Sequence, residues 1–212
     1  MTGFLVVLDV DSTLVENEVV ELLAEEAGSL ADVAAITARA MNGELDFEQS
    51  LRHRVATLAG LPATVFETVR SRVQVTAGVT ELVAGVQQSG GRVGIVSGGF
   101  IEIVDPLAKS LGLNYWRANQ LEVVDGKLTG GLVGPIIDAE AKADALREWS
   151  ADFGVDLKLT VAIGDGANDL RMMEIAGLSV AFDAKELVRQ NADVVLAERN
   201  LSHVLPLLGV RG

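Results

Sequence analysis

The feature that most constrains this chain is an apolar run near its start, Phe4 to Leu8, that leads directly into two aspartates, Asp9 and Asp11. Such a run predicts a strand that is buried on both faces. Alternate residues of a strand share a face, so Asp9 and Asp11 lie together if the strand continues through both. Two like charges at that spacing oppose each other's ionisation unless a cation lies between them. The alternative is a strand that stops and a turn in which Asp11 caps the next helix.

Two later strands are also predicted to end in polar residues. In open α/β sheets, ligands bind in the crevice outside the carboxyl ends of the strands. The strand ends therefore predict one shared site, together with a lysine near the start of the predicted helix Asp138 to Trp149. The residues involved are Ser97-Gly98-Gly99 after Arg92 to Val96, Lys142 on the helix, and Gly164-Asp165-Gly166-Ala167-Asn168-Asp169 after Leu159 to Ile163.

The periodicity of the chain changes near residue 75. Before it, apolar residues recur at helical spacing with breaks at glycines, and Asp46 and Pro62 are expected to begin helices. After it, strands alternate with helices, with a hairpin over 121–132 that turns at Asp125-Gly126. The fold class is therefore α/β with a doubly wound parallel sheet. Residues 1–14 and 76–212 are expected to form the core, and residues 15–75 an inserted helical-bundle cap.

Composition limits the classes of function. The 212 residues are 49% hydrophobic, which is enough for a sizeable core. The absence of cysteine excludes thiol catalysis, disulfides and thiolate zinc sites. A net charge of −13 argues against a nucleic-acid partner but not against a small phosphate ester, which one cation can balance locally. With no leader segment and no long apolar run, we expect a cytoplasmic protein with no membrane partner, either a monomer or a homodimer.

The motifs quoted above resemble, in order and spacing, the four motifs of the haloacid dehalogenase (HAD) superfamily of phosphatases. Further segments are similar to the phosphoserine phosphatases within it, so the resemblance covers nearly the whole chain. It implies a Rossmann-like HAD core with a helical cap, and Mg²⁺-dependent conversion of O-phospho-L-serine to L-serine and phosphate, the last step of serine biosynthesis. These segments are Glu16 to Glu18, Phe47 to Val55, Asp125 to Gly130 and Ala181-Phe182.

The resemblance also implies roles for the candidate residues. Asp9 is expected to attack phosphorus and form an aspartyl-phosphate, and Asp11 to act as general acid and then general base. Mg²⁺ is expected on the Asp9 carboxylate, the Asp11 backbone carbonyl and Asp165, with Asp169 orienting a neighbouring group. The phosphoryl group is expected to meet Ser97, Gly98, Gly99, Lys142 and Asn168, while Glu18, Met41, Phe47 and Arg54 form the substrate pocket of the cap.

Several alternatives remain open at this stage. Taken alone, Lys142 and Arg54 are typical of surface charges on helices, Met41 and Phe47 of a bundle core, and Asp165 and Asp169 of helix caps. The chain is also compatible with another HAD phosphatase or a phosphotransferase that passes the phosphoryl group to an alcohol such as homoserine. A phospho-aspartate signalling domain is the candidate from a different class. It requires neither a general acid at Asp11 nor a helical cap. Cap movement is expected to need hinges near residues 13–16 and 72–78.

Overall fold

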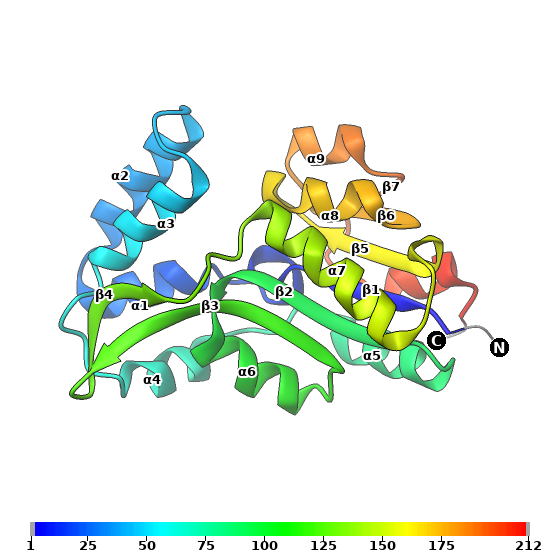
Figure 1. Ribbon diagram of the computed structural model, residues 1–212, viewed down its shortest axis with the longest axis horizontal. Coiled ribbons are helices and arrows are strands. Elements are labelled where there is room, and N and C mark those ends of the chain that lie inside the picture. Colours follow the sequence, from blue (N-terminus) through cyan, green and yellow to red (C-terminus); the bar gives the residue numbers. More distant parts are fainter. Residues whose placement is uncertain (1–2, 211–212) are drawn as a thin grey trace.

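The structure is a computed structural model that describes residues 3–210 (Figure 1). Residues 1–2 and 211–212, which the prediction assigns to the core, lie outside the described residues. The described part consists of a sheet with helices on both faces and a group of helices beyond one end of the sheet (Figure 1).

Within the described residues the sheet has seven strands in the order β4-β3-β2-β1-β5-β6-β7. All neighbours are parallel except β3 and β4. Strand β1 occupies the centre and is fully buried, as its unbroken apolar sequence predicts. This confirms the predicted α/β class. The strands are β1 (Leu5–Leu8), β2 (Arg92–Phe100), β3 (Tyr115–Val124), β4 (Lys127–Val133), β5 (Thr160–Gly164), β6 (Leu178–Phe182) and β7 (Val194–Leu196).

The two faces of the sheet bury two separate clusters because residues of β1 alternate between them. Val6 and Leu8 pack with one set of helices, and Leu5 and Val7 with the other. The first face carries α5 (Val79–Gln88), α6 (Ile101–Ser110) and a short 3₁₀ helix at Leu201–Leu208. The second carries α7 (Ala139–Phe153), α8 (Leu170–Ile175) and α9 (Glu186–Asn191), above the sheet in Figure 1.

The predicted hairpin at Asp125-Gly126 is confirmed. Val124 pairs with Lys127, and both turn residues have positive φ, 49° and 74°, as a type I′ turn requires. Strand β3 begins at Tyr115 rather than Leu121, because its first half pairs in parallel with β2 before it reaches the hairpin.

The helices between β1 and α5 are α1 (Val19–Ala27), α2 (Leu30–Met41), α3 (Phe47–Ala56) and α4 (Val65–Arg72). Asp46 begins α3 as predicted, because its Oδ1 accepts from Gln49 N at 2.8 Å and Gln49 Oε1 accepts from Asp46 N at 3.1 Å. Helix α4 begins at Val65, not at Pro62. The apolar interior of these helices continues into α6, β3 and β4 through residues such as Ile103 and Leu128.

The two segments that join these helices to the sheet lie side by side. Val15 pairs with Val75 in an antiparallel bridge. Glu16 N donates to Gln74 O at 2.8 Å, and Thr76 N donates to Leu14 O at 3.0 Å. The chain therefore leaves the sheet and returns to it at one place, which we call the crossing pair (residues 14–16 and 74–76). The boundary between the two predicted domains stays a prediction.

Across residues 3–210, every helix is too short or too polar to cross a bilayer.

Candidate active site

Three neighbouring central strands bring the predicted residues to one edge of the sheet. Strand β1 lies between β2 and β5, so their carboxyl ends are adjacent. Asp9 follows β1, Ser97 lies near the end of β2 and Asp165 follows β5. Helix α7 supplies Lys142 from the second face. The structure thus collects residues from four distant segments of the chain, as expected for the strand ends of an open α/β sheet.

Asp9 is held in a fixed position at the end of β1. Its Oδ1 accepts from Val10 N at 2.7 Å and lies 2.6 Å from Lys142 Nζ. Only 5% of the residue is exposed. Burial, and then the Asp169 carboxylate, raise the pKa of Asp9 well above its ordinary value, although Lys142 opposes them. The Val10 N–H and the Lys142 ammonium therefore fix the orientation of this carboxylate.

Asp11 lies in a tight turn rather than on a continued strand. The turn spans Val10–Leu14 and includes Ser12 at a φ of 57°. Asp11 Oδ1 accepts from Val19 N, the first residue of α1, at 2.7 Å, and Oδ2 accepts from Ser97 Oγ at 3.1 Å. The alternative in which Asp11 caps the next helix is therefore correct for Oδ1, which binds the start of α1. The other oxygen, Oδ2, faces the strand ends. Burial, followed by Glu18, raises the pKa of Asp11 to about 6.

Lys142 is fully buried between two carboxylates. Its Nζ lies 2.6 Å from Asp9 Oδ1 and 2.8 Å from Asp169 Oδ1. Burial alone lowers the pKa of Lys142, but the Asp169 and Asp9 carboxylates outweigh burial and raise it above its ordinary value. The ammonium is therefore a permanent charge, and the surface alternative for this lysine is wrong. The second oxygen of Asp169 accepts from Gly166 N at 3.1 Å.

The acidic residues of this site can hold a metal ion. One carboxylate oxygen each from Asp9, Asp165 and Asp169 lies within 4.8 Å of the others. Oxygen donors of this kind suit hard divalent cations. Burial, and then Asp169, raise the pKa of Asp165 to about 6, while Lys185 opposes this. The donor set therefore fits the cation that was predicted. Both Asp169 oxygens already accept from protein donors, which leaves Asp9 and Asp165 as the better-suited ligands.

The segment Ser97-Gly98-Gly99 packs tightly beneath the site. Ser97 is fully buried, and its Oγ accepts from Gly99 N at 2.7 Å as it donates to Asp11. A Cβ on Gly99 would lie 2.7 Å from Asp11 Oδ2, so a glycine is needed there. The Gly99 N–H thus donates to Ser97 Oγ, which in turn donates to Asp11, and the anion cradle stays a prediction. The arrangement orients Asp11.

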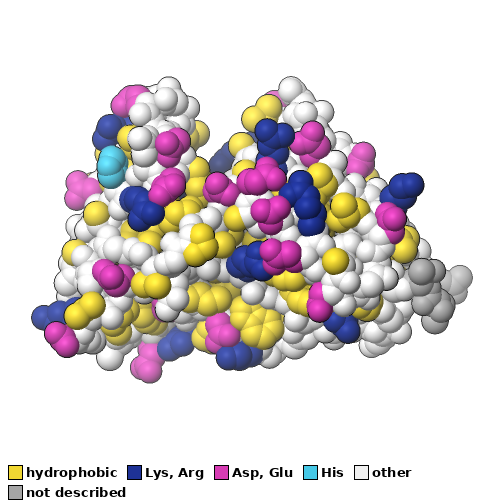
Figure 2. Space-filling view, viewed as in Figure 1, with side chains coloured by type: hydrophobic (Ala, Val, Ile, Leu, Met, Phe, Trp, Pro, Cys, Tyr) yellow, Lys and Arg dark blue, Asp and Glu magenta, His cyan; other side chains and the backbone are white. Residues whose placement is uncertain are grey.

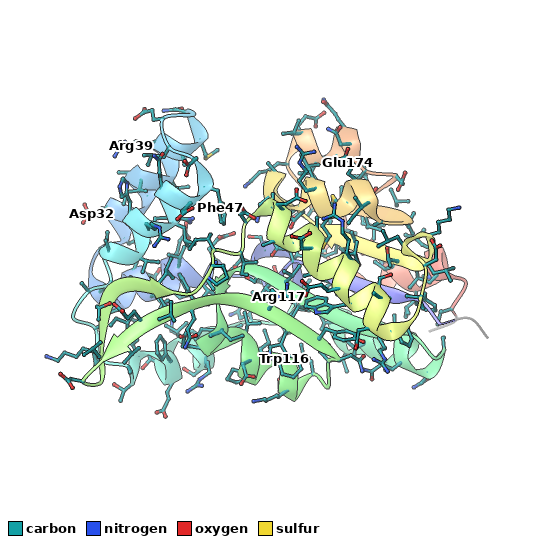
Figure 3. The ribbon with its side chains drawn as sticks, in the orientation of Figure 1. Asp32, Arg39, Phe47, Trp116, Arg117 and Glu174 are labelled. Carbon is teal, nitrogen blue, oxygen red and sulfur yellow. The ribbon has the colours of Figure 1, made fainter. Side chains whose placement is uncertain are left out.

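A cavity of about 670 Å³ opens above these residues, between the helices α1–α3 and the strand ends. Figure 2 shows it as a notch between two raised parts of the surface. Phe47 faces the notch from the side of α3 (Figure 3). Ser97, Lys142 and Asp169 lie beneath the floor and are fully buried. The predicted residues that line the cavity are Asp9, Asp11, Glu18, Met41, Phe47, Arg54, Gly98, Gly99, Asp165 and Asn168.

Opposite charges lie on the helical side of the cavity. Glu18 Oε1 accepts from Ser12 Oγ at 2.8 Å, and Arg54 Nε donates to Ser50 O at 3.4 Å. Burial lowers the pKa of Arg54, although Glu18, Asp11 and Glu21 oppose this through their charges. Met41 is 77% exposed at the end of α2, so it lies at the mouth of the cavity. It does not belong to the bundle core that the sequence left as an alternative.

The lining residues that were not predicted include Glu21, Thr37, Ala40 and Lys185. Glu21 follows Glu18 by three residues on α1, and Thr37 and Ala40 precede Met41 by four and one on α2. Residues three or four apart on a helix face the same side, and Ala40 follows Thr37 by three. Extending each predicted pocket residue along its helix would therefore have found these three. Lys185 has no comparable pattern, because it precedes α9 in a loop.

Comparisons with known proteins agree with this geometry. The family model of the haloacid dehalogenase-like hydrolases matches residues 6–174. A phosphoserine phosphatase of Mycobacterium tuberculosis is 52% identical over 209 residues, which cover 99% of this chain and 51% of that protein. A phosphoserine phosphatase of Streptococcus thermophilus is 51% identical over 204 residues, which cover 96% of this chain and 95% of that protein.

Solved structures show the same likeness. A phospho-aspartyl intermediate analogue of a phosphoserine phosphatase has a TM-score of 0.92 and 42% identity, and the match covers 98% of this chain and 99% of that one. The chain spans about half the length of some of the curated relatives that it matches.

Proposed function

Because the chain belongs to the haloacid dehalogenase-like hydrolases, we propose that it hydrolyses O-phospho-L-serine to L-serine and phosphate through an aspartyl-phosphate at Asp9. The relatives that match over most of this chain are named phosphoserine phosphatases. A closely similar solved structure is described as an analogue of the phospho-aspartyl intermediate.

One observation carries the proposal: a single cavity has Asp9 and Asp11 at its floor and Glu18 and Arg54 on its helical side. Phosphoserine carries a phosphate, an ammonium and a carboxylate on a small frame. We assign the phosphate to the floor, the ammonium to Glu18 and the carboxylate to Arg54, whose planar fork suits a carboxylate. Phe47 and Met41 border the same space and are positioned to limit water there.

The reaction is assigned in two steps. An oxygen of the Asp9 carboxylate attacks phosphorus, the ester P–O bond breaks, and protonated Asp11 gives its proton to the serine oxygen. Asp11, now ionised, takes a proton from water as that water attacks phosphorus. The acyl-phosphate P–O bond breaks, and Asp9 and free phosphate are released. The raised pKa of Asp11, about 6, supports a residue that both gives and takes a proton near neutral pH.

We assign Mg²⁺ to the Asp9 and Asp165 carboxylates and the Asp11 backbone carbonyl. When bound, this ion supplies positive charge to the phosphoryl oxygens. The fixed ammonium of Lys142, 2.6 Å from Asp9 Oδ1, adds charge from beneath. Asn168 lines the cavity beside Asp165 and is assigned to the phosphate. Asp169 holds Lys142 in place.

The test is steady-state phosphate release with Mg²⁺ and with chelator, for L-phosphoserine, phosphothreonine, phosphoethanolamine, a sugar phosphate and a nucleotide. The Asp9→Asn variant is the control for the nucleophile. A Mg²⁺-dependent kcat/KM that favours L-phosphoserine by about a hundredfold and is abolished by Asp9→Asn is the expected result.

Similar activity on all five substrates would support the aspartyl-phosphate mechanism but exclude phosphoserine as the preferred substrate. A persistent phospho-aspartate without turnover would support a signalling domain instead. The cytoplasmic location and the monomeric or homodimeric state stay predictions from the sequence. Cell fractionation tests the location, and light scattering measures the assembly.

A further inference from the structure

A single arginine outside the predicted site touches the turn that carries Asp11. Arg199 follows β7, and 32% of its side chain is exposed. Its Nε lies 2.8 Å from Glu16 Oε2, its Nη1 lies 2.7 Å from Asp183 Oδ2, and its Nη2 donates to Ser12 O at 3.2 Å. The guanidinium carbon also lies 5.8 Å from the centre of the Phe182 ring. Three of its nitrogens therefore bind three separate segments.

Two of those segments contain a non-glycine residue with positive φ. Ser12 has a φ of 57° and Asp183 a φ of 43°. Aspartate tolerates the left-handed region, whereas serine adopts it less readily, so surrounding contacts must hold Ser12 there. Ser12 lies in the turn after β1, and Asp183 follows β6. Arg199 binds the Ser12 carbonyl and the Asp183 carboxylate together, so it links both turns at the same edge of the sheet.

The contact with Ser12 reaches the site directly. Ser12 follows Asp11, and its Oγ donates to Glu18 Oε1 at 2.8 Å. Asp11 itself accepts from Val19 N and Ser97 Oγ at fixed positions. A rotation of the Ser12 peptide therefore moves the Asp11 carboxylate away from Val19 N and Ser97 Oγ. It also displaces Ser12 Oγ, which donates to Glu18. The guanidinium of Arg199 restrains that rotation through its hydrogen bond to Ser12 O.

The residues after Arg199 contact the chain just beyond the other half of the crossing pair, at Ala77 and Gly78. Leu201 N donates to Ala77 O at 2.8 Å. A Cβ on Gly78, whose φ is 81°, would lie 2.0 Å from Asn200 Oδ1, so this approach is close. The segment 199–201 thus contacts both connections between the sheet and the helices α1–α4. Within this segment, Arg199 is the residue that contacts the turn carrying Asp11.

We propose that Arg199 is a positioning residue for ester cleavage, because it holds the turn Val10–Leu14 so that the Asp11 carboxyl group faces the leaving oxygen. The assignment rests on the proposed function in one respect, the role of Asp11 as proton donor. Misplacement of a catalytic group by about 1 Å can lower a rate by about a hundredfold. Loss of Arg199 is therefore expected to lower kcat/KM for an alkyl phosphate by about 10- to 100-fold.

The leaving group distinguishes this role from general stability. Serine leaves as a basic alkoxide and needs a proton, whereas p-nitrophenolate leaves without one. The value of kcat/KM covers only the steps up to departure of the leaving group, so it leaves out the hydrolysis of the aspartyl-phosphate that both substrates share. The Arg199→Met variant should therefore lose 10- to 100-fold in kcat/KM on L-phosphoserine and less than about threefold on p-nitrophenyl phosphate. Arg199→Lys, which keeps a charge but not the planar fork, should fall between Arg199→Met and the wild type on L-phosphoserine.

Arg117→Met is the matched control. Arg117 lies on β3, away from the cavity (Figure 3). Its side chain is 33% exposed and pairs with Glu148, and its guanidinium carbon lies 5.7 Å from the centre of the Trp149 ring. It should change the two activities equally and slightly. Equal losses on both substrates in Arg199→Met, or the same substrate ratio as in Arg117→Met, would overturn the proposal.

A second measurement does not depend on the substrate. Amide hydrogen exchange of residues 12–18 should be faster in Arg199→Met and unchanged in Arg117→Met, at a temperature where both variants are folded. If the wild type hydrolyses another alkyl phosphate instead of phosphoserine, the proposed substrate fails and the same comparison is made with that ester. If the wild type hydrolyses neither ester, the proposed function fails. Unchanged exchange in Arg199→Met would then overturn the positioning role.

Discussion

Replacing Lys142 by methionine should destabilise the fold strongly. Lys142 is fully buried, and its Nζ lies 2.6 Å from Asp9 and 2.8 Å from Asp169. Methionine keeps the apolar part of the side chain and removes the ammonium. The two buried carboxylates then lose the cation that lies between them, and removing one partner of a buried pair costs about 3–5 kcal/mol.

The size of the effect depends on pH. In a chain of this length, 1 kcal/mol corresponds to roughly 2–4 °C in Tm, so the expected loss is roughly 6–20 °C near pH 8. Burial, and then Asp169, already raise the pKa of Asp9 in the folded protein. A carboxyl group with a raised folded pKa favours folding below its unfolded pKa and disfavours folding as pH rises through the folded value. The deficit of Lys142→Met should therefore shrink from about pH 8 to about pH 5.5.

Thermal unfolding of both proteins in chelator at these two pH values measures the difference. Lys109→Met is the control, because Lys109 is 64% exposed and pairs with Asp105 across one helical turn. Such exposed pairs contribute at most about 1 kcal/mol. If Lys142→Met melted within about 3 °C of the wild type near pH 8, as Lys109→Met should, the argument from buried charge would be refuted.

Three further outcomes are expected. Arg54→Ala should raise KM for L-phosphoserine about 10- to 100-fold, through loss of a charged hydrogen bond, and leave KM for an aryl phosphate nearly unchanged. An equal rise of KM for both substrates in steady-state kinetics would show that Arg54 binds the phosphate or supports the fold instead. Gly99→Ala should lower kcat by about a hundredfold, because its Cβ would lie 2.7 Å from Asp11 Oδ2; full activity in a folded variant would contradict the tight packing. Burial raises the pKa of Glu102, whose Oε1 accepts from Leu121 N and whose Oε2 lacks a partner within residues 3–210. Glu102→Gln should therefore gain stability relative to the wild type as pH rises from about 4 to about 8. An equal gain at both pH values in urea unfolding would contradict this.

Local patterns were sufficient to predict most of the fold. The run Leu5–Leu8 is a central buried strand because its four residues are apolar on both faces. Asp125-Gly126 makes a type I′ turn because both residues tolerate positive φ. The start of β3 was missed because Tyr115 to Gln120 is neither continuously apolar nor alternating, and it pairs beside β2 while half-buried.

The site was less accessible to local reasoning. A lysine near a helix start reads as solvated, and only the packing of α7 on the sheet puts Lys142 between Asp9 and Asp169. The resemblance to a family selected Lys142, whereas no periodicity distinguished it. Arg199 had neither a motif nor a spacing to mark it, since its partners lie 16 to 187 residues away in the chain. Contacts of that separation exist only after the sheet has assembled.

The crossing pair also bears on the order in which the chain folds. Strand β1 pairs with β2 at Leu5 and Arg92, across the whole helical segment, and closing so long a loop of disordered chain costs conformational entropy. The contacts within α1–α4 are mostly local, and local contacts form quickly. Once these helices pack and Val15 meets Val75, the ends of the intervening segment are already together. The packed helices α1–α4 are then expected to lower the loop-closure entropy that the pairing of β1 with β2 costs.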